Sequence, residues 1–148
     1  MKSKVVGVME NKSKKLPLPE QELLRLYELM ALNRHLDERC VKLQRSGRIH
    51  FYVPQLGQEA AQIGSAYALG PNDWVAPAYR EPGAALVRGV TVQQLVDQYF
   101  GNAHDLSKGR QMPNHYAFAQ NHFLSVSSPI GTQISHAAGL GMAFRIKK

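Results

Sequence analysis

Two stretches of this sequence follow neither a helical nor a strand period: Gly109-Arg110-Gln111-Met112-Pro113-Asn114-His115-Tyr116 and Ser125-Val126-Ser127-Ser128-Pro129-Ile130-Gly131-Thr132-Gln133. Both combine glycine and proline with many side chains that donate or accept hydrogen bonds. Segments with amphipathic helical patterns lie on either side of them. This composition is typical of a loop that binds a ligand. The sequence therefore predicts a largely helical chain that is interrupted by a long polar loop over residues 101–128.

Apolar residues recur at helical spacing along most of the remaining chain. Glu20 and Glu22 favour a helix start, because carboxylates suit the positive end of a helix, and Gly47 is placed to end that helix in the left-handed conformation. Thr91 and Gln94 match a capping box. The predicted helices cover residues 20–46, 57–69, 83–88, 92–99 and 131–142, and a short strand is predicted over 49–53. So many helices with almost no sheet indicate part of a larger α/β domain.

A chain of 148 residues with 44% hydrophobic residues is long enough for one domain with a core. Its net charge of +7 is uneven: five lysines and Glu10 lie in residues 1–15, whereas residues 16–144 hold ten basic and ten acidic residues. We therefore expect a basic, disordered tail over 1–15 and a domain over 16–148. Basic and aromatic residues are not interleaved as nucleic-acid binding would need, so no nucleic-acid partner is expected.

Several classes of site find no support in the sequence. Cys40 is the only cysteine, so no disulfide can form within the chain, which fits a reducing compartment. No run of about 18 apolar residues is present, so no membrane-spanning helix is expected. The six histidines form no His-x-x-x-His pair, which argues against a zinc site, and the GxGxxG pattern of dinucleotide sites is missing.

Three features could carry chemistry. Arg80 precedes a predicted helix start at Pro82, where a guanidinium and exposed helix N–H groups together suit an anion; a surface salt bridge is the alternative. The oxygen-rich segment 127–133 suits a hard cation or the polar edge of a flat ring; an N-capping turn made by Ser127 or Ser128 is the alternative. His115 lies in the polar loop, where an imidazole can transfer protons near neutral pH.

Taken together, these segments resemble the α subunit of the thiamine-diphosphate-dependent 2-oxo acid dehydrogenases, and most of all the branched-chain (2-oxoisovalerate) component. The ordered set is far more specific than any single piece. One stretch over 110–113 and another over 127–129 differ from the usual runs in pyruvate dehydrogenases, which favours branched 2-oxo acids. The matching pieces occur in the family's order over roughly residues 20–144: Gly47-Arg48-Ile49, Phe51-Tyr52, Gly57-Gln58-Glu59-Ala60, Tyr79-Arg80-Glu81-Pro82-Gly83, Lys108-Gly109-Arg110-Gln111-Met112-Pro113, His115-Tyr116, Ser127-Ser128-Pro129-Ile130 and Thr132-Gln133.

The resemblance implies an α/β thiamine-diphosphate-binding fold, of which this chain covers mainly the leading helices. It implies oxidative decarboxylation of a 2-oxo acid and acyl transfer to a lipoyl group, with thiamine diphosphate and magnesium as cofactors and potassium as a further candidate. The implied partners are a β subunit, in a complex of two α and two β chains, and a lipoyl-bearing acyltransferase. The implied location is the bacterial cytoplasm, or the mitochondrial matrix if the source is a eukaryote.

The family pattern also implies roles for individual residues. His115 would be the catalytic acid–base group. Ala78 stands where relatives often carry Gln or Tyr, which weakens one expected cofactor contact. The implied cofactor contacts are Tyr79 and Arg80 at the diphosphate, with Ser128, Pro129 and Ile130 at the aminopyrimidine end. The implied substrate contacts are Phe51, Tyr79, Met112, Pro113, Asn114, His115 and Ser128. The implied potassium ligands are Ser127, Pro129, Thr132 and Gln133.

One departure from the family pattern concerns the metal. The magnesium motif of the family, a Gly-Asp-Gly or Gly-Glu-Gly run followed downstream by Asn, does not occur in this sequence. It is expected shortly after position 148, so the resemblance implies the N-terminal piece of a longer subunit. Two alternatives stay open: the α subunit of a pyruvate or acetoin dehydrogenase, or a non-catalytic helical fragment whose basic tails dock on an acidic partner.

Overall fold

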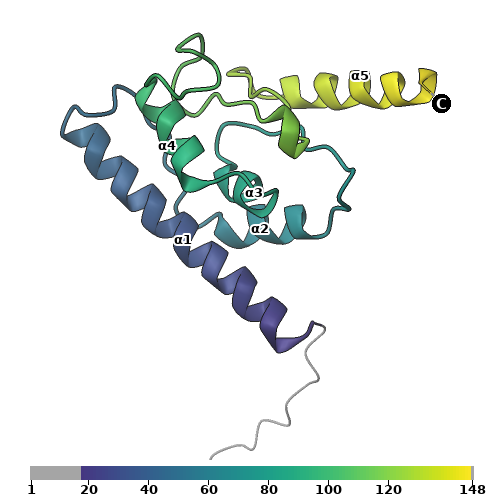
Figure 1. Cartoon of the computed structure of the whole chain (residues 1–148), viewed down its shortest axis with the longest axis horizontal. Coiled ribbons are helices and arrows are strands. Elements are labelled where there is room, and N and C mark those ends of the chain that lie inside the picture. The colour runs from purple at the N-terminus through teal and green to yellow at the C-terminus, as the bar shows by residue number, and fades with distance from the viewer. Residues whose placement is uncertain (1–17, 148) are drawn as a thin grey trace, which may run out of the picture.

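The structure, a computed structural model, describes residues 18–147, which form five α-helices and one 3-10 turn. Figure 1 shows the long first helix running beside the three short ones, while the last helix extends away from this group. The predicted tail over 1–15 lies outside the described residues. No helix within 18–147 has both the length and the apolar character needed to cross a membrane. The elements are α1 (Glu20–Arg45), α2 (Glu59–Tyr67), α3 (Pro82–Val87), α4 (Val92–Phe100), η1 (Ala119–Asn121) and α5 (Thr132–Ile146).

Helix α1 begins and ends where the sequence predicts. Its first turn carries Glu20 and Glu22, and its last turn carries Lys42 and Arg45, so the charges at both ends suit the helix dipole. Gly47 follows with a φ of 73°, in the left-handed region that glycine adopts without strain. Local signals in the sequence therefore fix both ends of the longest element.

Helix α4 confirms the predicted capping box. The Thr91 hydroxyl accepts from Gln94 N at 3.2 Å, and Gln94 Oε1 accepts from Thr91 N at 2.9 Å. Gly101, with a φ of 59°, ends the helix. Helix α2 is shorter than predicted, covering Glu59–Tyr67 rather than 57–69.

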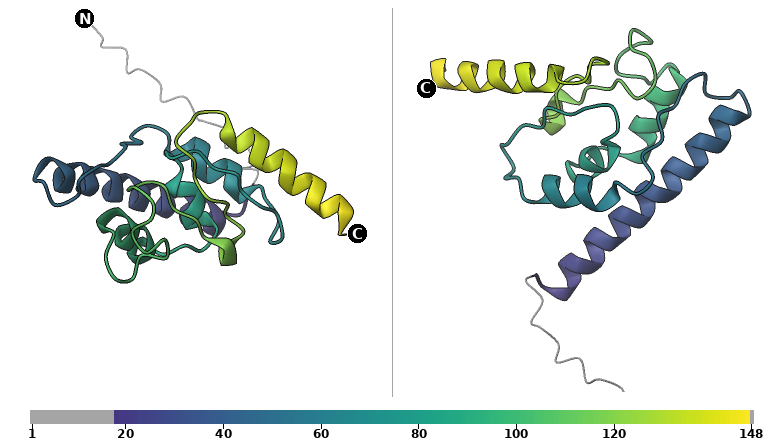
Figure 2. Two further views of the ribbon diagram at one scale, coloured as in Figure 1. Left: turned by 90° about the horizontal axis from the view of Figure 1, so that it is seen from above. Right: turned by 180° about the vertical axis from the view of Figure 1, so that it is seen from behind.

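The polar loop between α4 and α5 supplies much of the hydrophobic core. Tyr116 and Phe123 are fully buried, and the Tyr116 ring lies 5.4 Å from that of Phe118 and 5.9 Å from that of Phe123. These rings pack with buried hydrophobic residues of the helices, among them Leu95 and Cys40. Burial raises the pKa of the Cys40 thiol to about 12, so the thiol stays protonated. Both views in Figure 2 show the loop after α4 staying beside that helix.

Residues 49–53 do not form the predicted strand. Their backbone forms a hydrogen bond with a side chain rather than with a neighbouring strand: Val53 N donates to Asn114 Oδ1 at 2.9 Å. The predicted α/β class is therefore not seen in residues 18–147, which are all-helical, whereas the prediction that this chain covers mainly helices is confirmed. The β-type pairings among the described residues are two isolated bridges, Val75–Phe123 and Phe118–Phe123.

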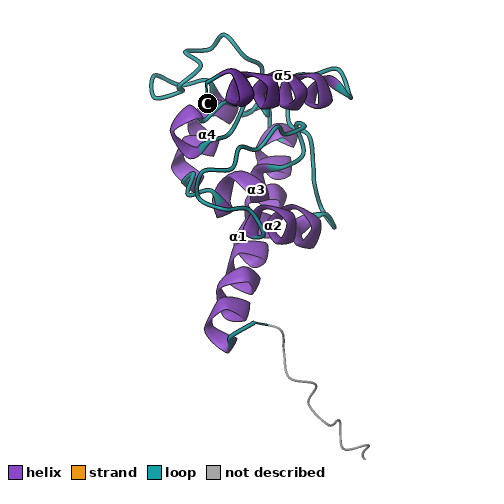
Figure 3. Ribbon diagram, turned by 90° about the vertical axis from the view of Figure 1, so that its right-hand side faces the viewer, coloured by secondary structure: helices purple, strands orange, loops and turns teal. Residues whose placement is uncertain are grey.

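Helix α5 has no buried residue. Ile134 is 72% exposed and Ile146 is 81% exposed. Figure 3 shows this helix across the upper part of the view, above the other helices. The predicted helix over 131–142 is confirmed and continues to Ile146, with its apolar side chains facing solvent.

Gly83, in the first turn of α3, is a position where no side chain fits. A Cβ there would lie 2.7 Å from Asn33 Nδ2 and 2.7 Å from Gln62 Oε1. Both amides are buried, and Gly83 N donates to Gln62 Oε1 at 2.8 Å. We expect Gly83→Ala to lower the free energy of unfolding by about 1–3 kcal/mol, the usual cost of overpacking, as measured by chemical denaturation.

Gly64→Ala is the matched control for this prediction. Gly64 lies within α2, and an added Cβ would meet no atom within 4 Å. Because alanine is the better helix former, this change should be neutral or stabilising by up to about 1 kcal/mol. Equal effects of the two changes would contradict the tight contact at Gly83.

Candidate functional site

Three segments that are distant in sequence meet around one open cavity of about 450 Å³. The first segment is residues 51–54, the second contains Tyr79 and Arg80, and the third is the polar loop. The cavity gathers most of the residues predicted to bind cofactor or substrate. Its lining is Phe51, Tyr52, Val53, Pro54, Tyr79, Arg80, Met112, His115 and Ser128.

His115 is held at both ring nitrogens. Its Nδ1 lies 3.0 Å from Pro113 O, and its Nε2 lies 2.7 Å from Ser128 Oγ. Because a carbonyl can only accept, Nδ1 must carry the proton, so in the neutral ring Nε2 accepts from the Ser128 hydroxyl. The Tyr79 ring stacks on the imidazole at 6.1 Å between centroids. The arrangement leaves a proton acceptor, Nε2, at the cavity.

Arg80 brings a positive charge to the same cavity. Its Nη1 donates to Pro54 O, and its guanidinium carbon lies 5.7 Å from the centroid of the Tyr79 ring. Among residues 18–147 the one ion pair joins Arg34 and Glu59, so no carboxylate of the described chain neutralises Arg80. The predicted alternative, a surface salt bridge at Arg80, is therefore wrong for the described residues. A guanidinium without a counter-charge beside a cavity suits an anion.

Four of the residues predicted to bind cofactor or substrate lie outside the cavity lining. Pro113 contributes only its carbonyl, to His115. Asn114 is buried behind the lining, with its Oδ1 accepting from Val53 N at 2.9 Å. Pro129 and Ile130 lie in the exposed turn before α5, where Ile130 is 83% exposed.

The segment 127–133 forms a tight turn at the start of α5. Pro129 O accepts from Thr132 N at 3.3 Å and from Thr132 Oγ1 at 2.9 Å, and Gln133 Oε1 accepts from Gly131 N at 3.0 Å. The N-cap residue is Gly131, so the predicted alternative of a cap made by Ser127 or Ser128 is wrong. In the part of the chain that the structure describes, no three His, Cys, Asp or Glu side chains gather as a metal site would need.

Two other clefts lack an unpaired cation beside a proton acceptor. One, of about 420 Å³, lies between α2 and Trp74 and is mostly apolar. The other, of about 530 Å³, lies between α1 and α2, where Arg34 and Glu59 neutralise each other. The cavity at His115 is therefore the better candidate for chemistry.

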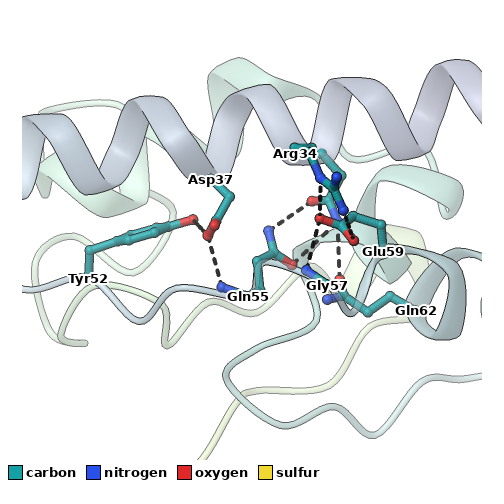
Figure 4. A network of polar contacts seen from close by, with 8 residues as sticks. Arg34, Asp37, Tyr52, Gln55, Gly57, Glu59 and Gln62 are labelled. Atoms are coloured by element: carbon teal, nitrogen blue, oxygen red, sulfur yellow. Dashed lines mark hydrogen bonds and ion pairs between the residues drawn. The ribbon is translucent and has the colours of Figure 1, made fainter.

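Helix α1 fixes the cavity wall through a buried carboxylate (Figure 4). Asp37 Oδ1 accepts from Tyr52 OH and from Gln55 N, each at 2.9 Å. Burial raises the pKa of the Tyr52 phenol, so it stays protonated and donates. Gln55 Nε2 donates in turn to Asn33 Oδ1 at 2.9 Å. No sequence motif marks Asn33, Asp37 or Gln55; Tyr52 was indicated only as part of the matching Phe51-Tyr52 segment, without a role of its own.

Glu59, the first residue of α2, is held on α1 by Arg34 (Figure 4). Arg34 Nε and Nη2 donate to the two carboxylate oxygens, each at 2.9 Å. The paired guanidinium lowers the pKa of the Glu59 carboxyl to about 2. A carboxyl whose pKa falls on folding stabilises the fold above its unfolded pKa of about 4.3, and this stability is lost as the pH falls through the folded pKa.

We therefore expect the midpoint of thermal unfolding to fall more steeply from about pH 5 to about pH 2 in the wild type than in Glu59→Gln, since glutamine does not titrate. Circular dichroism at a series of pH values measures this. Glu28→Gln, at an exposed position of the same α1, is the matched control and should follow the wild type. An unfolding midpoint that depends on pH equally in Glu59→Gln and in the wild type would contradict the lowered pKa of the Glu59 carboxyl.

Comparison with known proteins gives this site a context. A family model described as "Dehydrogenase E1 component" matches residues 27–148. The chain is 45% identical over 133 residues to 2-oxoisovalerate dehydrogenase subunit alpha 1, mitochondrial, of Arabidopsis thaliana, covering 90% of this chain and 28% of that protein. It is 43% identical over 140 residues to 2-oxoisovalerate dehydrogenase subunit alpha of Bacillus subtilis (strain 168), covering 93% and 42%. It is 41% identical over 137 residues to 2-oxoisovalerate dehydrogenase subunit alpha, mitochondrial, of Homo sapiens, covering 93% and 31%.

The chain thus spans between 28% and 42% of the length of these relatives. The family match nevertheless extends over most of the chain and includes every residue that lines the cavity. The chain therefore belongs to the dehydrogenase E1 component family, and within it resembles the α subunits of 2-oxoisovalerate dehydrogenases.

Proposed function

We propose that this chain is the leading part of the α subunit of a branched-chain 2-oxo acid dehydrogenase, which decarboxylates a 2-oxo acid and passes the acyl group to a lipoyl group. The family match and the names of the relatives support this proposal. The single observation that carries it is the convergence of Arg80 and the His115–Ser128 pair on one cavity. A cation for an anionic cofactor and a proton acceptor for the reaction thus line the same cavity.

Thiamine diphosphate is the cofactor of this family, and the residues at the cavity fit its charged end. Arg80 has no carboxylate partner among residues 18–147, so its guanidinium can pair with a diphosphate, with Tyr79 beside it. Ser128, Pro129 and Ile130 are the proposed contacts at the aminopyrimidine end. When bound, thiamine diphosphate supplies the carbanion that attacks the 2-oxo carbon and the electron sink for the loss of carbon dioxide.

His115 is the proposed acid–base group. Pro113 O holds the Nδ1 proton at 3.0 Å, so the Nε2 lone pair points to the Ser128 hydroxyl and the cavity. Nε2 can accept a proton there and return it, while the Ser128 hydroxyl turns to follow the charge. The stacked Tyr79 ring limits rotation of the imidazole during this exchange.

The apolar lining supports a branched aliphatic substrate. Phe51, Val53 and Met112 line the cavity as an apolar wall, and Pro113 and Asn114, which are not part of the lining, complete the proposed substrate segment. Each additional methylene that this wall covers contributes about 0.8 kcal/mol relative to a smaller substrate such as pyruvate. The wall therefore favours 2-oxoisovalerate and its homologues over pyruvate or acetoin.

The remaining cofactors and partners of the proposal follow the family. Magnesium is a proposed cofactor whose ligands belong to the Gly-Asp-Gly or Gly-Glu-Gly motif of the family, which this sequence lacks. A potassium ion is proposed at the oxygens of Ser127, Pro129, Thr132 and Gln133. The proposed partners are a β subunit, in a complex of two α and two β chains, and a lipoyl-bearing acyltransferase. The proposed location is the cytoplasm of a bacterium or the mitochondrial matrix of a eukaryote.

Turnover by the complete subunit, assembled with its β partner, tests the proposed function. Reduction of an artificial electron acceptor is followed with 2-oxoisovalerate, pyruvate or acetoin as substrate. We expect activity to require thiamine diphosphate and magnesium, and kcat/KM to be about 10-fold or more higher for 2-oxoisovalerate than for pyruvate. A preference for pyruvate or acetoin would select that alternative, and no turnover of any of the three would favour the non-catalytic helical fragment.

A further inference from the structure

The turn that carries His115 is held from behind by a side chain of α4, and we propose that Gln98 is a positioning residue for His115. The inference deepens the proposed function and rests on it, since it takes His115 as the acid–base group. Gln98 is 3% exposed and does not line the cavity, so it can act on the reaction only through the turn.

Both ends of the Gln98 amide bond to the same turn. Nε2 donates to Met112 O at 2.8 Å, and Oε1 accepts from Asn114 N at 3.1 Å. These two backbone groups flank Pro113, whose carbonyl lies 3.0 Å from His115 Nδ1. Gln98 therefore fixes the backbone on either side of the carbonyl that determines which ring nitrogen carries the proton.

The turn does not hold this shape by backbone bonds alone. The one backbone bond that closes it runs from His115 N to Met112 O at 3.1 Å. Asn114 has a φ of 67°, a left-handed conformation that is uncommon outside glycine. Within the described residues, Asn114 N has no backbone acceptor, so without Gln98 it would be a buried donor with no partner.

Helix α4 is suited to support such a turn. It is capped at both ends by the Thr91–Gln94 box and by Gly101. Leu95 and Tyr99, on either side of Gln98 along the helix, are buried in the core. A functional side chain is held most exactly where its support lies on a rigid element with fixed rotamers, and Gln98 meets that condition.

The first test needs no substitution. Hydrogen exchange of the chain, resolved to single amides, reports whether Asn114 N–H is bonded. We expect this amide to exchange at least about 10-fold more slowly than an unbonded loop amide, because Gln98 Oε1 is its acceptor. Exchange at the rate of an exposed loop amide would overturn the proposal.

The second test measures the imidazole itself. Diethyl pyrocarbonate modifies unprotonated imidazole nitrogens, and mass spectrometry of peptides gives a separate rate for each histidine. We expect Gln98→Met to raise the rate at His115 by about 2- to 10-fold, the population change that loss of a neutral hydrogen bond produces, while the rates at His35 and His122 stay unchanged. Gln44→Met, at an exposed position of α1, is the matched control and should leave all three rates unchanged.

Each outcome decides the proposal without any measurement of activity. An unchanged rate at His115 in Gln98→Met would overturn it. A rise at all histidines together would also overturn it, because Gln98 would then support the fold as a whole rather than the turn. Since neither readout uses cofactor or substrate, failure of this inference is distinct from failure of the proposed function, which turnover and cofactor binding test.

Discussion

Replacing His115 with alanine is expected to lower turnover of the assembled α/β enzyme by about 10²- to 10⁴-fold, the usual contribution of a positioned acid–base group. The reason is the held imidazole, with Nε2 2.7 Å from Ser128 Oγ at the cavity. Affinity for thiamine diphosphate should change little, because the charged cofactor contact, the Arg80 guanidinium, is held by Pro54 O and not by His115. Steady-state kcat and a calorimetric Kd on the same preparation measure the two effects separately.

Two further variants sharpen this expectation. His35→Ala removes an exposed histidine of α1 that is outside the cavity, and it should turn over at the wild-type rate. Ser128→Ala removes only the hydroxyl partner of Nε2, so its loss of turnover should be smaller than that of His115→Ala. Wild-type turnover in His115→Ala would reassign this histidine to the structure of the loop.

Arg80→Ala should weaken binding of thiamine diphosphate by about 1.5–3 kcal/mol, the cost of losing a hydrogen bond to a charged group. This corresponds to a rise of about 10- to 150-fold in Kd. The guanidinium has no carboxylate partner among residues 18–147 and is held at the cavity by Pro54 O and the Tyr79 ring. Isothermal titration of the assembled enzyme with the cofactor at saturating magnesium gives the value.

Arg39→Ala is the matched control for Arg80. Arg39 is exposed on α1 and lies outside the cavity, so its removal changes the net charge equally without touching the site. The Kd of Arg39→Ala for thiamine diphosphate should stay at the wild-type value. If Arg80→Ala and Arg39→Ala bound the cofactor equally well, the anion-binding role of Arg80 would be wrong.

The helix ends could be predicted from the sequence because local chemistry decides them. Carboxylates at Glu20, the Thr91–Gln94 box and the left-handed Gly47 each act within a few residues of chain. The prediction of a strand over 49–53 was wrong because a distant contact, not local chemistry, decides the structure there. Its apolar residues suit a strand, but the Val53 donor is taken by Asn114, 61 positions away, which no local pattern reveals.

The candidate site likewise contains residues that the sequence indicated and residues that it did not. The order of motifs indicated His115, Ser128 and Arg80 as site residues, and the structure brings all three to one cavity. The residues that hold them in place were missed. Asp37 fixes the wall and Gln98 fixes the turn, each through two hydrogen bonds across the tertiary structure, and such contacts carry no motif.

The polar loop has two roles, since some of its residues line the cavity and others belong to the hydrophobic core. Its glycines, prolines and polar residues indicated a binding loop, and His115 and Ser128 do reach the cavity from it. The same loop buries Tyr116 and Phe123 in the core, although these aromatic residues lie within a polar sequence. Burying them anchors the loop, so the residues that pack and the residues that face the cavity alternate along one segment.

Arg80 is proposed to bind the cofactor and His115 to act on the substrate within a single cavity. Paired measurement of cofactor Kd by calorimetry and of turnover with 2-oxoisovalerate, in wild type, Arg80→Ala and His115→Ala of the assembled enzyme, tests it most directly. We expect Arg80→Ala to raise Kd and to recover turnover at saturating cofactor more fully than His115→Ala, which should keep the wild-type Kd and lose turnover at every cofactor concentration. Wild-type Kd and turnover in both variants would contradict the account.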